Sequence, residues 1–154
     1  MTMTRMTDAE TEAVNELLQS SYTWLGEREG LTDAQTDFLV SQRGSLEHVR
    51  NESQAQSYLV ARDGARIVGV VAVSGEMVTK LYVGPEHMGK GVGRLLYEAA
   101  ESAIRAGGHT RVKLGAFPTA VPFYERMGLE VVSHRTPAGA LAGLNMAMME
   151  KHLD

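Results

Sequence analysis

"GPEHMGKGVGRLLYEAAESAIRAGG", residues 84–108, joins a glycine-rich loop to the strongest helical pattern in the chain. Gly89, Gly91 and Gly93 alternate immediately before that pattern. Apolar residues then recur on one helical face, at Val92, Leu95, Leu96, Ala99, Ala100, Ala103 and Ile104. The pair Gly107-Gly108 is typical of a helix end. The stretch therefore predicts a helix that begins in a glycine-rich loop and stops at Gly107.

The segments on either side of this helix predict strands. Two apolar runs within residues 57–75 flank Asp63-Gly64, a dipeptide that favours a tight hairpin turn, and a third strand follows over residues 76–83. After the helix, the pattern predicts strands at residues 110–117, 129–135 and 144–153 and a short helix at residues 119–128.

The first third of the chain predicts only helices. One covers residues 9–22, with Thr7 or Asp8 as its N-cap. Two more fall within residues 31–53, where Thr32 and Ser45 are candidate caps. Helices and strands in this order favour an α/β or α+β layer architecture with a mixed sheet.

Composition narrows the function. A chain of 154 residues with 44% hydrophobic residues is expected to form one domain, residues 1–154. A net charge of -4 argues against a nucleic-acid partner, and the absence of cysteine excludes a thiolate nucleophile or metal ligand. No segment has the ~20 apolar residues of a membrane span, and the N-terminus lacks the apolar core of a signal peptide. A cytoplasmic protein that meets neither membrane nor nucleic acid is expected.

The glycine-rich loop is a candidate phosphate cradle. Backbone N–H groups at glycines before a helix converge on an anion, and the helix N-terminus adds partial positive charge. The alternative is a turn that only lets helix and strand pack closely. A nucleotide-triphosphate loop would carry Ser or Thr at Gly91, and the dinucleotide fingerprint has a different glycine spacing. A metal-free pyrophosphate ligand such as coenzyme A is favoured.

Two segments resemble the GNAT superfamily of N-acetyltransferases. "MGKGVG", residues 88–93, occupies the place of that family's acyl-CoA signature Q/R-x-x-G-x-G/A. "AVPFYERMGLEVV", residues 120–132, matches the later family segment A-x-x-F-Y-E-x-x-G-F. The resemblance covers roughly residues 56–150. It departs at Met88, where Gln or Arg is usual, and at Phe117, where many members carry Asn.

This resemblance implies an α/β (α+β) fold with a mixed, mostly antiparallel central sheet flanked by helices. It also implies that the strand at residues 76–83 separates from the next strand. The implied reaction is direct: a neutral primary amine attacks the thioester carbonyl of acetyl-CoA, the thiolate leaves, and no metal takes part. The absence of cysteine agrees with this route, because it removes the usual covalent relay.

The resemblance also assigns roles to residues. The backbone of Leu81, Tyr82 and Val83 is expected to bind pantetheine and to donate to the oxyanion. The pyrophosphate cradle comprises Gly89, Lys90, Gly91, Val92, Gly93 and Arg94, of which Lys90 and Arg94 either meet phosphate oxygens or face water. Tyr124 is the predicted general acid. Glu76 is the candidate general base: it lies near where some family members place a glutamate, although its spacing to the glycine loop is not identical, and a one-residue slip would turn its side chain to the other face.

Alternatives to an N-acetyltransferase stay open. One is a non-catalytic acyl-CoA-binding regulatory module, and another is a toxin-like acetyltransferase of charged tRNA. The acceptor, a small-molecule or peptide amine, is not identified by the sequence, although Tyr22 and Trp24 lie where the family shapes the acceptor pocket. A homodimer through the methionine-rich last strand, with Met146, Met148 and Met149, is a further hypothesis.

Overall fold

A seven-stranded sheet organises the protein, and the computed structural model describes all of residues 1–154. The strands are β1 (Thr2–Arg5), β2 (Ser57–Asp63), β3 (Arg66–Ser74), β4 (Met77–Val83), β5 (Arg111–Ala116), β6 (Glu130–Arg135) and β7 (Met146–His152). Their order across the sheet is β1-β2-β3-β4-β5-β7-β6. Every neighbouring pair is antiparallel except β4 and β5. The predicted mixed, mostly antiparallel sheet is confirmed.

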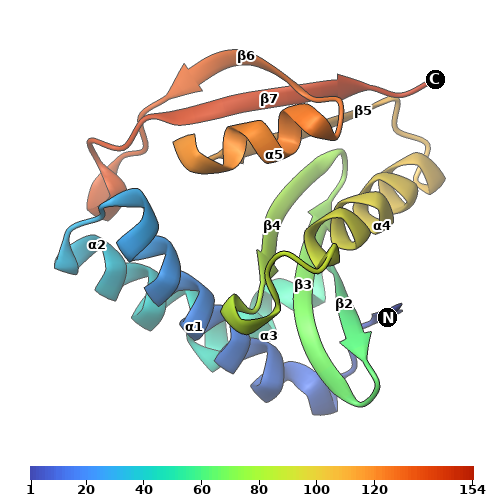
Figure 1. Cartoon of the computed structure of the whole chain (residues 1–154), viewed down its shortest axis with the longest axis horizontal. Coiled ribbons are helices and arrows are strands. Elements are labelled where there is room, and N and C mark those ends of the chain that lie inside the picture. Colours follow the sequence, from blue (N-terminus) through green and yellow to red (C-terminus); the bar gives the residue numbers. More distant parts are fainter.

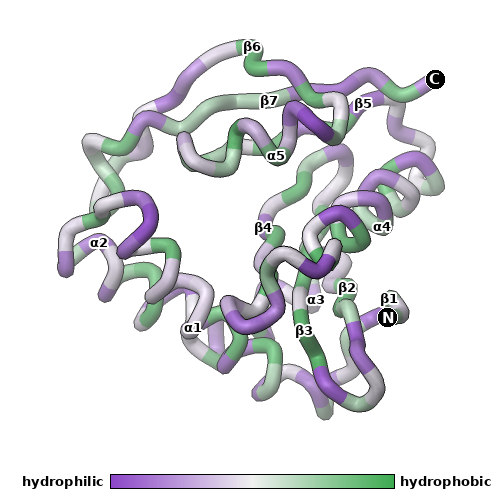
Figure 2. Tube along the Cα trace, viewed as in Figure 1, coloured by the Kyte–Doolittle hydropathy of each residue, from purple (hydrophilic) through white to green (hydrophobic).

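Helices cover both faces of this sheet (Figure 1). They are α1 (Thr11–Glu29), α2 (Asp33–Phe38), α3 (Leu46–Ala55), α4 (Val92–Ala106) and α5 (Val121–Arg126). One buried layer includes Leu96 of α4 and Tyr124 of α5, and the other includes Leu18 of α1 and Val49 of α3. Strand β3 lies between the two layers and is buried from Val68 to Val73, which Figure 2 shows as a hydrophobic run.

Helix α4 forms where the glycines predict it. Gly91 precedes the helix with φ of 82°, a left-handed conformation that glycine adopts without strain, and Gly107 caps the other end. The predicted apolar face is buried against the sheet through Val92, Leu96 and Ile104. The glycine loop is therefore held at the N-terminal end of a well-anchored helix.

The N-terminal third differs from the prediction. Residues 2–5, for which the sequence predicts no helix or strand, form β1 and pair with β2 along the sheet edge. "TMTR" has no buried face, so main-chain pairing with an open edge, and not hydrophobic alternation, makes this strand. Helix α1 also runs on to Glu29, beyond the predicted end at Tyr22, because Gly30 is the first residue with positive φ. No helix has the length and apolar character needed to cross a bilayer.

The sheet divides between β4 and β5. Their parallel pairing comprises one position, Met77 opposite Lys113, next to a hydrogen bond of 2.9 Å from the Lys113 amide to the Glu76 carbonyl. Beyond it the strands part, and Figure 1 shows β4 turning away from the β5–β7–β6 half. The separation that the resemblance implied is present, and it leaves backbone groups of β4 without a strand partner.

Close packing of α4 on β3 depends on Gly69. A Cβ at this buried position would lie 2.8 Å from Leu96 Cδ1, 3.0 Å from Val92 Cγ1 and 3.2 Å from the Tyr82 carbonyl oxygen. Leu96 is itself fully buried, so it has no free space in which to move aside.

We expect Gly69→Val to lower the free energy of unfolding by about 1–3 kcal/mol, because the added atoms overpack the interface between α4 and β3. Urea denaturation measures the change. Gly115→Val in β5 is the matched control, since its Cβ would meet only the flexible side chain of Met148, at ordinary distances of 3.5 Å to Sδ and 3.8 Å to Cε. Equal stability of the two variants would contradict the assigned packing role.

Candidate functional site

A cavity of about 940 Å³ lies where β4 and β5 part. Residues 78–83 of β4 and 114–117 at the end of β5 form two of its walls. The glycine loop, helix α5 and the C-terminal part of α1 complete it. The predicted residues that line it are Leu81, Tyr82, Val83, Gly89, Gly91, Val92, Gly93, Arg94 and Tyr124. Lys90 and Glu76 do not line it.

The glycine loop presents free backbone donors to this cavity. Gly89 and Gly91 have φ of 77° and 82°, and a Cβ at either would meet no heavy atom within 4 Å, so the requirement for glycine is conformational. The first helical bond of α4 runs from the Leu95 amide to the Gly91 carbonyl at 3.2 Å. The N–H groups of Val92, Gly93 and Arg94 therefore have no intrahelical acceptor, which is the arrangement that binds anions.

Gly93 is required for a different reason. A Cβ there would lie 3.2 Å from Cε1 and 3.3 Å from Cζ of Phe123, so the absent side chain lets α5 approach α4. Phe123 in turn packs edge-to-face against Tyr124, with ring centroids 5.1 Å apart. The third glycine of the motif thus positions the helix that carries the candidate acid.

Tyr124 presents an unshared hydroxyl to the cavity. Only 8% of the residue is exposed, its ring lies 6.4 Å from that of Tyr97, and its hydroxyl makes no hydrogen bond within the protein. Burial, with a smaller contribution from Tyr82, raises the pKa of Tyr124. The phenol stays protonated at neutral pH and is free to donate a hydrogen bond to a group bound in the cavity.

Glu76 lies away from the cavity, at the paired end of β4. Its carboxylate is 3.1 Å from Arg111 Nε and 3.4 Å from Lys113 Nζ. The hydrogen bond from Arg111, with help from Lys113, holds the pKa of Glu76 below its ordinary value. The structure therefore does not bring Glu76 together with Tyr124, and ties its carboxylate to two cations of β5.

Lys90 and Arg94 also differ from each other. Lys90 is exposed beside the cradle without facing the cavity, whereas Arg94 lines the cavity and pairs with Glu98 one turn later, at 2.7 Å.

The family model of the acetyltransferase (GNAT) domain matches residues 27–153. The chain belongs to the GNAT family of acetyltransferases. No curated protein sequence matches it.

Solved structures share the fold at low sequence identity. A GCN5-related N-acetyltransferase from Rhodopseudomonas palustris superposes with a TM-score of 0.90 at 20% identity, covering 99% of this chain and 95% of that one. The PaiA N-acetyltransferase from Thermoplasma acidophilum, in complex with coenzyme A, gives 0.77 at 19% identity, with 99% of each chain covered. The yncA protein from Salmonella typhimurium, with its cofactor acetyl-CoA, gives 0.75 at 18% identity, covering 100% and 94%.

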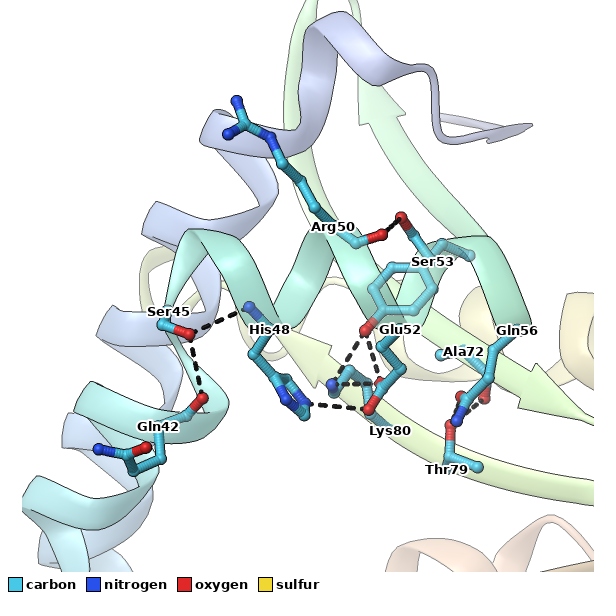
Figure 3. A network of polar contacts seen from close by, with 11 residues as sticks. Gln42, Ser45, His48, Arg50, Glu52, Ser53, Gln56, Ala72, Thr79 and Lys80 are labelled. Carbon is cyan, nitrogen blue, oxygen red and sulfur yellow. Dashed lines mark hydrogen bonds and ion pairs between the residues drawn. The ribbon is translucent and has the colours of Figure 1, made fainter.

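A buried ion pair next to the cavity of this GNAT protein was missed by the sequence reading. Lys80 of β4, 8% exposed, lines the cavity and donates to Glu52 Oε1 of α3 at 2.7 Å and to the Tyr58 hydroxyl at 3.0 Å (Figure 3). The Tyr58 hydroxyl donates to the same Glu52 oxygen at 2.6 Å, and His48 Nε2 lies 3.0 Å from the other. A lysine inside the apolar strand "MVTKLYV" was the available signal.

The pKa values of both Lys80 and Glu52 are shifted in this pair. Burial lowers the pKa of Lys80, and Glu52 partly offsets that effect. Burial alone would raise the pKa of Glu52, but hydrogen bonds from Lys80 and Tyr58 outweigh it and hold that pKa below the ordinary value of 4.5. Each charge therefore depends on the other to remain in this layer.

We expect Glu52→Gln to lower the free energy of unfolding at pH 7 by about 1–3 kcal/mol, because Lys80 loses its carboxylate partner. A carboxyl whose pKa is lower in the folded state than in the unfolded state stabilises the fold at pH values above its unfolded pKa. That stabilisation is lost as the pH falls through the folded pKa. The difference from wild type should therefore narrow below pH 4.5. Urea denaturation at pH 7 and pH 3 measures it, and a difference that grows at pH 3 would contradict this sign.

Lys80→Met alone should cost more, about 3 kcal/mol, since it leaves Glu52 without its cation, and the double variant Glu52→Gln/Lys80→Met should recover most of that loss. The double-mutant cycle by denaturation tests the coupling; additive losses would show that the two charges do not stabilise each other.

Proposed function

We propose that the protein transfers the acetyl group of acetyl-CoA directly to a primary amine, and that residues 1–154 act in this as one domain. The observation that carries the proposal is the cavity between β4 and β5, which joins the glycine cradle at one end to the unshared Tyr124 hydroxyl inside. Membership of the acetyltransferase family and the fold shared with structures that contain coenzyme A support it.

The residues present fit coenzyme A. The open space above Gly89 and Gly91, which any Cβ would occupy, leaves the N–H groups at the start of α4 accessible to pyrophosphate oxygens. Arg94 lies beside them, and Gly91 and Val92 would contribute backbone donors. When bound, acetyl-CoA supplies the acetyl group as an activated thioester.

The unpaired edge of β4 would hold the rest of the ligand. From Leu81 to Val83 this strand pairs only with β3, so the N–H and C=O groups that alternate toward β5 have no strand partner there. One of them, the Val83 carbonyl, accepts a hydrogen bond of 3.4 Å from the Ser21 hydroxyl. In our proposal they bind the amide groups of the pantetheine arm, and one N–H donates to the thioester oxygen as negative charge develops on it. Because backbone groups do this, Met88 in place of Gln or Arg removes no necessary contact.

Tyr124 would act at the sulfur. As the amine nitrogen bonds to the carbonyl carbon and the carbon–sulfur bond breaks, the electron pair passes to sulfur, and the phenol donates its proton there. The phenol then regains a proton from water, which receives the one that the amine loses. The raised pKa of Tyr124, caused first by burial, favours stabilisation by a strong hydrogen bond over early proton release. The amine proton leaves to water in this scheme, since Glu76 lies outside the cavity.

We expect Gly91→Ala to raise the Kd for coenzyme A about tenfold, because a residue with a side chain strains this left-handed position and fills the space above the cradle. Calorimetric titration measures the Kd. Gly139→Ala is the matched control: its φ is 75°, its Cβ is equally unobstructed, and it lies outside the cavity. A similar loss of affinity in both variants would contradict the binding of coenzyme A at the glycine loop.

We expect Tyr124→Phe to lower kcat by roughly 10²-fold or more with little change in the KM for acetyl-CoA, because it removes only the hydroxyl. Thiol release across a panel of primary amines gives both constants. Tyr97→Phe is the control, since Tyr97 is a buried neighbour whose hydroxyl bonds Glu101 and does not line the cavity. Unchanged turnover of Tyr124→Phe would refute its role, and tight coenzyme A binding without release for any amine would favour a regulatory module.

A further inference from the structure

The cavity has an acceptor end whose charge is unbalanced. Beyond the glycine cradle it is lined by Lys80 of β4 and by Trp24, Arg28 and Glu29 from the last turns of α1. Glu29 is the only carboxylate among all the residues that line the cavity. Which charge an acceptor should carry here therefore depends on the hydrogen bonds and ion pairs that Glu29, Arg28 and Lys80 already make within the protein.

Glu29 already makes hydrogen bonds across the cavity, to Thr119. Its carboxylate accepts hydrogen bonds from the Thr119 hydroxyl and from the Thr119 amide, in the turn between β5 and α5. This contact bridges α1 to that turn. The one carboxylate of the cavity thus connects two of its walls, and its oxygens already accept hydrogen bonds from Thr119 before an acceptor amine binds.

Arg28 retains free donors. Its Nε bonds the Thr119 hydroxyl oxygen at 3.0 Å, and its guanidinium lies 4.9 Å from the centroid of the Trp24 ring. No carboxylate lies within 4.0 Å of it. The two contacts fix the plane of the guanidinium while both terminal nitrogens stay available, which suits bidentate binding of a carboxylate.

Lys80 also has an unused donor. An ammonium carries three N–H groups, and Glu52 and Tyr58 accept two of them. The side chain is 6% exposed, and the residue forms part of the cavity wall. A buried N–H without an acceptor is costly, so an oxygen supplied by a ligand would be bound with a gain.

We propose that the amine acceptor also carries a carboxylate, and that Arg28 and Lys80 recognise it. This inference rests on the proposed function, because it names the substrate class of the same site. A carboxylate would give Arg28 the anionic partner that it lacks and would accept the unused N–H of Lys80, whereas a polycationic acceptor would meet the unpaired Arg28 and a Glu29 that is already engaged. The carboxylate can belong to a free amino acid or to an acidic side chain of a short peptide.

The experiment compares acceptors that differ in one charge. ω-Amino acids, the corresponding ω-amino amides and the α,ω-diamines of equal length are assayed with acetyl-CoA by thiol release. We expect kcat/KM for the acids to exceed that for the amides by about tenfold or more, with the diamines lowest. Tripeptides with Asp or Asn at the second position form a parallel arm: preference for the Asp peptide alone assigns the carboxylate to a peptide, and preference in the first series assigns it to a free amino acid.

Variants then identify the residues responsible. Arg28→Met and the charge-balanced double variant Glu52→Gln/Lys80→Met should each reduce the acid-to-amide ratio at least threefold, through the KM for the acid, with the KM for acetyl-CoA unchanged. Arg50→Met is the charge-matched control, because Arg50 is exposed on α3 outside the cavity and forms no ion pair. It should leave the ratio as in wild type.

Three results would overturn the inference. Amides or diamines turned over as well as the acids would show that no carboxylate is recognised. Variants that slow every acceptor equally would show that Arg28 and Lys80 act only structurally. A raised KM for acetyl-CoA with an unchanged acid-to-amide ratio would assign them to the cofactor. Thiol release that does not depend on the charge of the acceptor contradicts this inference but leaves the proposed acetyl transfer intact. No thiol release with any amine contradicts both the inference and the proposed function.

Discussion

The pairing of β4 with β5 at a single position is the constraint on which the rest of the structure depends. A parallel pair that continued along both strands would close the sheet and satisfy the backbone groups that now line the cavity. The site exists because the sheet is held together at one end, through Met77 and Lys113, and open at the other. Glu76 belongs to the closed end, where its contacts with Arg111 and Lys113 join the two halves.

The two halves are kept apart and aligned by helices. Helix α4 packs so closely on β3 that Gly69 cannot carry a side chain, and its N-terminus brings the cradle to the open end. Helix α5 reaches α4 through the absent side chain of Gly93, which places Tyr124 beside the gap. On the other face α1 spans to the turn after β5, through the contacts of Arg28 and Glu29 with Thr119.

Much of this fold is predictable from sequence because its signals are local. The hairpin at Asp63-Gly64 and the amphipathic face of α4 follow from neighbouring residues, and both are present. Strand β1 is not predictable in this way, since "TMTR" forms a strand only through pairing with β2. The glycine loop was predicted from its own glycine pattern and Tyr124 from a resemblance between motifs, and residues of both line one cavity.

Residues whose function depends on distant partners were beyond the sequence. Glu76 lies at the paired end of β4, where Arg111 and Lys113 hold its carboxylate, and no local sequence pattern reveals those contacts. Lys80 looked like part of an ordinary strand because its partners, Glu52 and Tyr58, reach it from two other elements. Likewise, the orientation of Arg28 and Glu29 depends on Thr119, which lies 90 residues after Glu29 in the sequence.

The central claim is that coenzyme A binds where β4 and β5 part, with its pyrophosphate on the N-terminus of α4. Backbone amide chemical shifts, followed by NMR as coenzyme A is added, test it most directly. The account predicts that the largest changes occur at residues 89–94 and 81–83, with none at the far edge of the sheet in β1. Changes confined to other regions, or no change at the glycine loop at saturating ligand, would contradict it.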